Sequence, residues 1–125
     1  MDIDKKKIKG LKRIAKKGDI KAIKELAGMY PFGSAQYLSW YTKAGKLGDL
    51  YAQRSMAEYY YVQASIIVGV SSSYAAQNAW KVKDYLNKAE EWYEKASSNP
   101  AVTKNEKTTI EKKLSEIKEI LWHLC

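Results

Sequence analysis

Apolar residues recur along this chain at steps of three and four residues, the spacing that places side chains on one face of an α-helix. Ile8, Leu11 and Ala15 predict a first helix over about residues 5–17, with Asp4 as its N-cap. No sustained alternation of apolar and polar positions predicts a β-strand. The pattern therefore predicts an all-α protein of six helices joined by short turns.

Short breaks divide these helices. Gly18-Asp19 and Gly48-Asp49 each place a glycine, which tolerates left-handed backbone, before a carboxylate that can cap the next helix. Residues 31–33 end the second helix, and residues 69–73 separate a fourth helix, ending near residue 68, from a long fifth helix ending near residue 97. Ser34 is expected to cap the third helix. Thr103 and Glu106 form a capping box for the last helix.

The chain contains an internal repeat. The segment 15–22 recurs at 45–52, thirty residues later, whereas Trp40-Tyr41-x-Lys43-Ala44 recurs as Trp92-Tyr93-x-Lys95-Ala96 after 52 residues. The difference predicts an insertion of about 22 residues between Tyr60 and Trp92. Alanines at the repeated positions let helices approach closely, while the aromatic rings fill the wider gap.

Over residues 15–97 the sequence resembles the Sel1-like repeat family, a branch of the tetratricopeptide-like α-solenoids. The motifs that carry the resemblance are Leu26-Ala27-Gly28-Met29-Tyr30, Trp40-Tyr41-x-Lys43-Ala44, Gly48-Asp49-x-x-Ala52-Gln53 and Trp92-Tyr93-x-Lys95-Ala96. The chain departs from the family in a shortened loop at residues 31–34, in Glu58 and Tyr59 where a small residue is usual, and in an expanded second loop. The resemblance implies a scaffold for protein–protein interaction, in which the first helix of each pair lines a concave face. It implies no chemistry.

We therefore expect one domain over residues 1–125: a short tetratricopeptide-like α-solenoid of about two Sel1-like helical hairpins. A basic N-terminal helix (1–17) and an amphipathic C-terminal helix (103–125) are expected to cover its two ends. Trp122 is expected to be packed rather than functional.

The charge is unevenly distributed. Lys and Arg number 22 against 14 Asp and Glu, a net charge of +8, and residues 1–25 hold ten of these cations and four of the acids. Between residues 50 and 80 the charged residues are Arg54 and Glu58.

The apolar stretch 64–70 is too short to span a bilayer, and the start lacks the apolar region of a signal peptide. We expect a cytoplasmic protein, with delivery into a host cell left open.

One stripe on the fourth helix is the first candidate site. Its members follow one another at steps of three, four and three residues, on the side of the helix opposite Ala52 and Met56, and they are Tyr51, Arg54, Glu58 and Tyr61. Tyrosine and arginine are enriched in binding hot spots. The stripe predicts a groove for a protein or peptide, with an acidic partner favoured by the net charge. Such a protein would act as an inhibitor, immunity or adaptor protein. Packing of both tyrosines on the inserted segment is the alternative.

The basic N-terminal helix is the second candidate site. Lys5, Lys9, Lys12 and Lys16 share one face, with Arg13 beside them. Such a face can bind nucleic acid or another polyanion in a sequence-independent way. The alternative is a solvated surface, which the excess of lysine over arginine (20 to 2) favours, because arginine is the usual ligand for bidentate phosphate contacts.

No residue pattern indicates catalysis. His123 and Cys125 stand two residues apart, and positions i and i+2 of a helix point to different sides. A single cysteine and a single histidine supply neither an internal disulfide nor a zinc ligand set. We expect no enzyme activity, no catalytic residue, no cofactor and no metal; the oligomeric state stays open.

Overall fold

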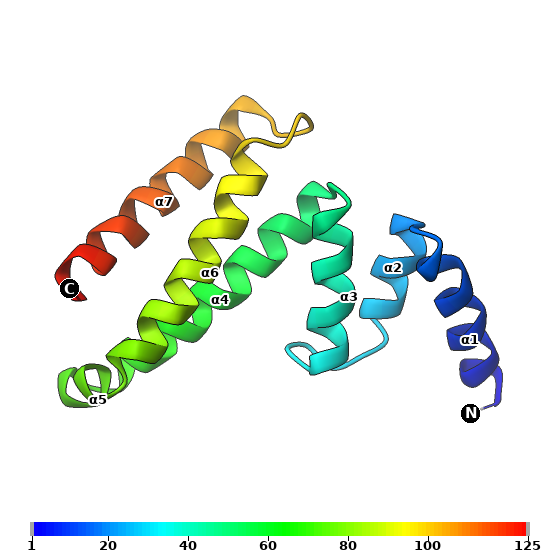
Figure 1. Cartoon of the computed structure of the whole chain (residues 1–125), viewed down its shortest axis with the longest axis horizontal. Helices are drawn as coiled ribbons and strands as arrows, with labels where there is room; N and C mark the ends of the chain where they lie inside the picture. The colour runs from blue at the N-terminus through cyan, green and yellow to red at the C-terminus, as the bar shows by residue number, and fades with distance from the viewer. Residues whose placement is uncertain (1, 125) are drawn as a thin grey trace. The chain divides into compact units, whose positions relative to one another are not determined.

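The computed structural model describes residues 2–124, with side chains from residue 5 onward. These residues form α1 (Asp2–Lys16), α2 (Ile20–Ala27), α3 (Ala35–Lys46), α4 (Leu50–Val70), α5 (Ser72–Gln77), α6 (Ala79–Ser97) and α7 (Lys104–Leu124) (Figure 1). No strand occurs among residues 2–124, so the prediction of an all-α protein is confirmed.

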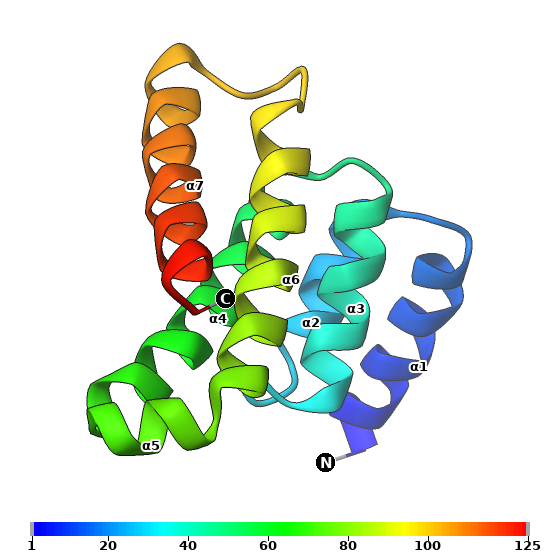
Figure 2. The same ribbon diagram turned by 60° about the vertical axis from the view of Figure 1, so that its left-hand side comes forward.

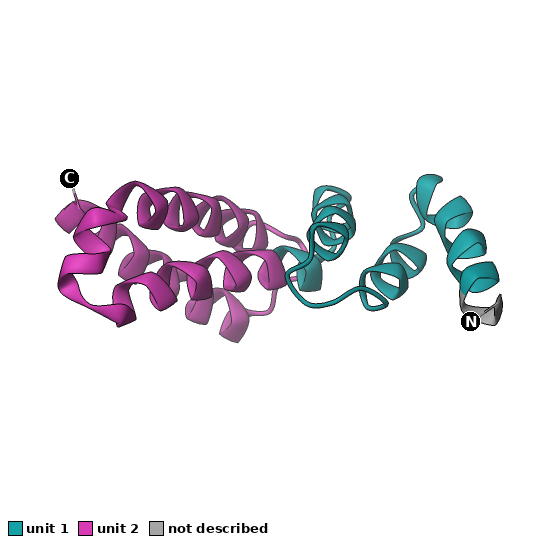
Figure 3. Cartoon of the chain, turned by 90° about the horizontal axis from the view of Figure 1, so that it is seen from below, with its two compact units in different colours: residues 1–53 teal, residues 54–125 magenta. Residues whose placement is uncertain are grey.

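The chain divides into two compact units, residues 1–53 and residues 54–125, and the division falls within α4 (Figure 3). Unit 1 contains α1, α2, α3 and the first turn of α4. Unit 2 contains the rest of α4 together with α5, α6 and α7.

In unit 1, α2 packs against both α1 and α3 (Figure 1). Its buried face carries Ile23 and Leu26, both fully enclosed, and the neighbouring helices contribute small residues, Ala15 on α1 and Ala44 on α3, which are also fully buried. The Gln53 side chain is buried as well, and its Nε2 donates to the Gly45 carbonyl oxygen at 3.0 Å, which ties the start of α4 to α3. Close helix contact therefore rests on alanine at the crossing points.

The two Gly-Asp turns adopt the predicted geometry. Gly18 and Gly48 have φ angles of 93° and 99°, in the left-handed region that favours glycine. The Ala22 amide then donates to Asp19 Oδ1 at 2.9 Å, and the Ala52 amide donates to Asp49 Oδ2 at 2.8 Å. Ser34 caps α3 in the same way, accepting from the Tyr37 amide at 3.2 Å. These N-caps were expected from the sequence and are confirmed.

Two boundaries in unit 1 differ from the predicted ones. The first helix begins at Asp2, so Asp4 has helical backbone and is not the N-cap, because a cap residue lies outside the helical conformation. The second helix ends at Ala27 rather than at the Pro31 break, because the Met29 and Tyr30 amides donate to the carbonyls three residues back, of Leu26 and Ala27, and no longer to those four residues back. A loop over residues 28–34 therefore precedes α3.

Unit 2 is built on α6 and α7, which run side by side (Figure 2). The apolar face of α6, which includes Val82 and Leu86, is buried, and α7 contributes the buried residues Ile110 and Ile117. The capping box of α7 is confirmed: the Glu106 amide donates to Thr103 Oγ1 at 3.1 Å and the Thr103 amide to Glu106 Oε1 at 3.2 Å.

The predicted insertion forms the second half of α4, all of α5 and the beginning of α6. One long helix was expected from about residue 74 to residue 97, and this was wrong: the segment is two helices, which makes seven helices in residues 2–124 instead of six. Ser71 is extended and its Oγ accepts from the Tyr74 amide at 3.0 Å, which starts α5. Asn78 Nδ2 donates to the Tyr74 carbonyl at 2.9 Å and so competes with the backbone where α5 ends.

Consecutive helices pack on one another within each unit, while the solenoid arrangement and the single domain stay predictions. None of the described helices combines the length and the apolar character that crossing a membrane requires.

Two glycines provide a matched test of this backbone. We expect Gly48→Ala to destabilise the protein by about 1–2 kcal/mol, because alanine is strained at a positive φ. Gly10 lies inside α1, and a Cβ there would meet nothing within 4 Å. Gly10→Ala should therefore stabilise the protein by about 0.5–1 kcal/mol. Urea unfolding followed by circular dichroism measures both; equal effects of the two changes would contradict the assigned turn.

Candidate functional site

The four residues of the predicted stripe lie on α4, with Tyr51 in unit 1 and Arg54, Glu58 and Tyr61 in unit 2. Tyr51 is 61% exposed, whereas Arg54 and Tyr61 are half-buried and Glu58 is exposed. The stripe therefore divides into two groups with different surroundings.

In unit 2 the stripe meets α7. Arg54 Nη1 donates to Glu106 Oε2 at 2.8 Å, and Lys113 Nζ lies 4.4 Å from the centroid of the Tyr61 ring. Hydrogen bonds with Thr103, and next the charge of Arg54, lower the pKa of Glu106, which keeps this carboxylate ionised. Arg54 and Tyr61 thus act in the packing of α7, since their polar and aromatic groups are already engaged.

A small cavity of about 110 Å³ lies beside these contacts, lined by Arg54, Glu58, Tyr93, Thr109, Ile110 and Lys113. Tyr93 is 7% exposed. Burial, with the Glu58 carboxylate as the next cause, raises the pKa of Tyr93 to about 12. The Tyr93 hydroxyl therefore stays protonated at neutral pH. The cavity itself is too small for a sizeable ligand.

In unit 1, Tyr51 continues a row of aromatic rings. The ring centroids of Phe32 and Tyr37 are 5.2 Å apart, those of Tyr37 and Tyr41 are 4.7 Å apart, and those of Tyr41 and Tyr51 are 6.3 Å apart. The two ends of the row, Phe32 and Tyr51, are 71% and 61% exposed, while Tyr41 is buried beneath them. We call these four residues the aromatic row.

A lysine and a carboxylate complete the row at its Tyr51 end. Lys24 Nζ lies 5.0 Å from the Tyr51 ring centroid and 3.4 Å from Asp49 Oδ1. Burial, followed by neighbouring tyrosines, raises the pKa of both Tyr37 and Tyr41, so both hydroxyls are neutral donors at neutral pH. The arrangement offers wide apolar contact together with a positive charge and hydroxyl groups, a combination suited to a peptide or protein surface.

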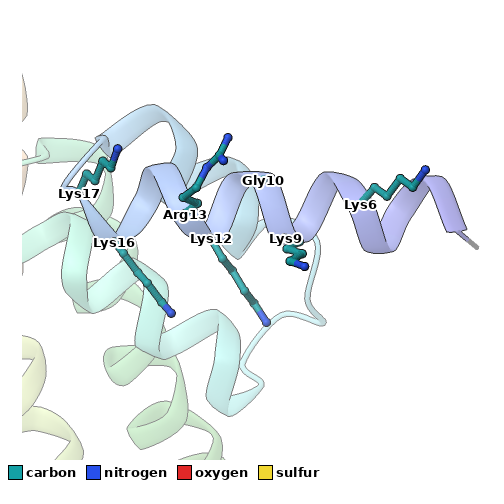
Figure 4. Close-up of a pocket in the computed structure, with 7 residues that line it drawn as sticks. All are labelled: Lys6, Lys9, Gly10, Lys12, Arg13, Lys16 and Lys17. Carbon is teal, nitrogen blue, oxygen red and sulfur yellow. The ribbon is translucent and has the colours of Figure 1, made fainter.

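The basic face of α1 forms the other candidate site. An open pocket with a volume of about 680 Å³ lies along this helix, and its lining residues are Lys6, Lys9, Gly10, Lys12, Arg13, Lys16 and Lys17 (Figure 4). Figure 4 shows Lys9, Lys12 and Lys16 projecting to one side of the helix and Lys6, Arg13 and Lys17 to the other. Lys5 is exposed on the same helix, and Lys7 instead pairs with Glu25 of α2 at 3.3 Å. The other cations of α1 form no ion pair with an acidic residue whose side chain is described.

Several residues were missed or misjudged from the sequence. The row members Phe32, Tyr37 and Tyr41 were not predicted as a site, although the four-residue step from Tyr37 to Tyr41 places both rings on one face of α3. Trp122, expected to be packed, is 78% exposed, which corrects that prediction. The turn of α7 that carries Trp122 lies beyond the buried seam, which ends at Ile117.

Among residues whose side chains are described, no group of three or more His, Cys, Asp or Glu residues is placed to hold a metal ion. Comparison with protein-family models, with curated proteins and with solved structures finds no match to this chain. The Sel1-like resemblance therefore stays a prediction that rests on the motifs in the sequence.

The raised pKa of Tyr93 predicts a specific loss of stability in alkali. In the unfolded chain this hydroxyl ionises near pH 10 and in the folded chain near pH 12, so its contribution is complete below pH 10 and is lost as the pH rises toward 12. Tyr93→Phe should flatten that part of the stability profile. Urea unfolding between pH 9 and pH 12 measures the slope, and Tyr74→Phe, at an exposed tyrosine, serves as the control. An unchanged slope in Tyr93→Phe would contradict the assignment.

Proposed function

We propose that this chain is a non-enzymatic interaction module that binds a protein or peptide through the aromatic row of unit 1. The observation that supports the proposal is the exposed Tyr51 ring, which lies tilted against the Tyr41 ring of the row and is flanked by the Lys24 ammonium. The contact surface is thereby centred on Tyr51 instead of on the whole predicted stripe, because Arg54 and Tyr61 are engaged by α7.

The chemistry of unit 1 favours an acidic partner. Residues 1–53 contain twelve Lys and Arg against five Asp and Glu, a net charge of +7. Like a tyrosine-rich paratope, the row presents large rings with few rotatable bonds, so little conformational entropy is lost on contact. Long-range attraction then speeds the encounter with an acidic peptide, and the rings supply most of the buried contact area. A role as an inhibitor, immunity or adaptor protein is compatible with this mode of binding.

The proposal predicts that Tyr51 is a binding hot spot. Peptides selected on the full-length protein from a random display library should bind Tyr51→Ala roughly tenfold more weakly, the loss typical of an interface aromatic. Fluorescence anisotropy with the selected peptides measures the affinity. The control is Tyr74→Ala, which removes an exposed tyrosine from α5. Equal affinity for the wild type and Tyr51→Ala, with unchanged helicity, would contradict the proposal.

A second candidate function is polyanion binding by α1. It is favoured by one observation, the surface lined by six cations and Gly10, on a helix that has no Asp or Glu between Asp4 and Asp19. Gly10 has no packing partner that would require its small size, and a glycine inside a helix costs about 1 kcal/mol relative to alanine. Its side-chain-free surface leaves room for a phosphate between the lysines on either side.

This candidate predicts a steep salt dependence. A labelled single-stranded oligonucleotide should bind the native protein. In the triple variant Lys9→Gln, Lys12→Gln, Lys16→Gln, the slope of log K against log salt concentration should be smaller in magnitude by about 2. The reason is that each phosphate contact contributes about 0.7 to this slope. The matched control removes three exposed lysines of α7 with Lys104→Gln, Lys107→Gln and Lys112→Gln. Equal slopes for the two triple variants would show that net charge alone, and not α1, holds the strand.

A further inference from the structure

The end of unit 2 that contains α5 is apolar and uncharged. Residues 59–80 contain no Asp, Glu, Lys or Arg. Six apolar or aromatic side chains of this segment are between 42% and 68% exposed: Val62, Ile66, Val68, Val70, Tyr74 and Trp80. We call these six residues the uncharged end.

The exposed residues come from three helices that meet at this end. Val62, Ile66 and Val70 follow one another at four-residue steps along α4, and α5, which carries Tyr74, has no buried residue. Trp80 opens α6, and α5 packs against α6. A helical stripe of this kind is normally covered in a globular protein, whereas here it is exposed.

An apolar cavity opens beside the same stretch of α4. It measures about 290 Å³ and is lined by Tyr61, Ala64, Ser65, Val68, Gly69, Leu86 and Ile120. Val68 belongs both to this lining and to the uncharged end. Val68 lies two positions from Ile66 and from Val70, so it points to another side of α4 than the exposed stripe. The cavity is therefore a separate apolar feature of the same stretch of α4, with room for an aliphatic chain.

We propose that the uncharged end docks onto the surface of an anionic lipid bilayer, with its aliphatic side chains at the level of the acyl chains. Tryptophan and tyrosine prefer the depth of the headgroups, because each has an apolar ring and one polar group. The other residues of segment 59–80 are tyrosine, serine, glutamine, asparagine, alanine, glycine and isoleucine, so no charge has to leave water. Lys81, whose ammonium lies 5.8 Å from the Trp80 ring centroid, stands where it can reach lipid phosphates.

Charge distinguishes this occupant from a second copy of the chain. Each copy carries a net charge of +8, so two copies repel one another at long range, while an anionic bilayer attracts the protein. Attraction of this kind supplements the burial of a few apolar side chains, which alone gives only weak attachment. The proposal does not involve the aromatic row, but the long-range attraction draws on the cations of residues 1–25, which carry +6 of the net charge of +8.

Vesicle binding by the full-length protein tests the proposal. The protein is sedimented with vesicles of phosphatidylcholine and phosphatidylserine in equal parts, and with vesicles of phosphatidylcholine alone. We expect the double variant Ile66→Gln, Trp80→Gln to partition onto the anionic vesicles at least roughly tenfold more weakly, since two large apolar side chains no longer insert. Glutamine preserves the net charge and the helix propensity. The matched control is Leu47→Gln, which replaces an exposed leucine of unit 1 and should change partitioning less than twofold.

A second measurement, the quenching of tryptophan fluorescence, tests whether the uncharged end inserts among the acyl chains. The vesicles for this measurement contain phosphatidylserine and phosphatidylcholine brominated in its acyl chains. Bromine should quench the tryptophan fluorescence of the native protein and of Trp122→Phe, but much less that of Trp80→Phe. Circular dichroism confirms that each variant is folded.

Three results would overturn the proposal. One is the absence of sedimentation with anionic vesicles. Another is equal sedimentation of the native protein and the double variant, which would assign membrane attachment to the cations alone. The third is a concentration-dependent dimer in lipid-free solution that the double variant abolishes, which would make the uncharged end a contact between copies.

Discussion

The close approach of neighbouring helices at alanine is the constraint on which the rest of the structure depends. Ala15, Ala27 and Ala44 in unit 1, and Ala57 and Ala96 in unit 2, are completely buried. A larger side chain at any of these positions would separate two helix axes and open a gap that the surrounding residues are too short to fill. The rings of Tyr41, Trp92 and Tyr93 are buried alongside these alanines and supply large apolar surfaces to the two cores.

Much of the fold could be predicted because it is encoded over a few residues. The Gly-Asp turns, the Ser34 cap and the Thr103–Glu106 capping box each depend on side chains within three positions of the amides they satisfy. The division between α5 and α6 was missed because it depends on the side chain of Asn78, which fits a helix equally well in a sequence pattern. The contact of Arg54 with Glu106 joins residues 52 positions apart, and no local rule predicts it.

The same distinction separates the two candidate sites. The basic face of α1 follows directly from helical spacing, so its lysines were identified in advance. The aromatic row combines residues from a loop, from α3 and from the first turn of α4, and only tertiary packing brings Tyr51 onto Tyr41.

Lysine side chains also contribute to the packing of aromatic rings. Six lysine ammonium groups among the described residues lie 4.4–5.8 Å from the centroid of an aromatic ring. Proteins typically show about one energetically significant contact of this kind in 70–80 residues. The lysine-rich composition is thus part of how the aromatic side chains are held.

The aspartates of the two Gly-Asp turns have the same sequence context but make different numbers of stabilising contacts. Asp19 uses one oxygen for a helix cap, whereas Asp49 divides its carboxylate between the start of α4 and the ammonium of Lys24 on α2. An asparagine could replace Asp19 and still begin a helix, but at position 49 it would sever an electrostatic tie between two helices. Substitution should therefore be better tolerated at position 19 than at position 49. Among related chains, the aspartate at position 19 would be lost more readily than the one at position 49.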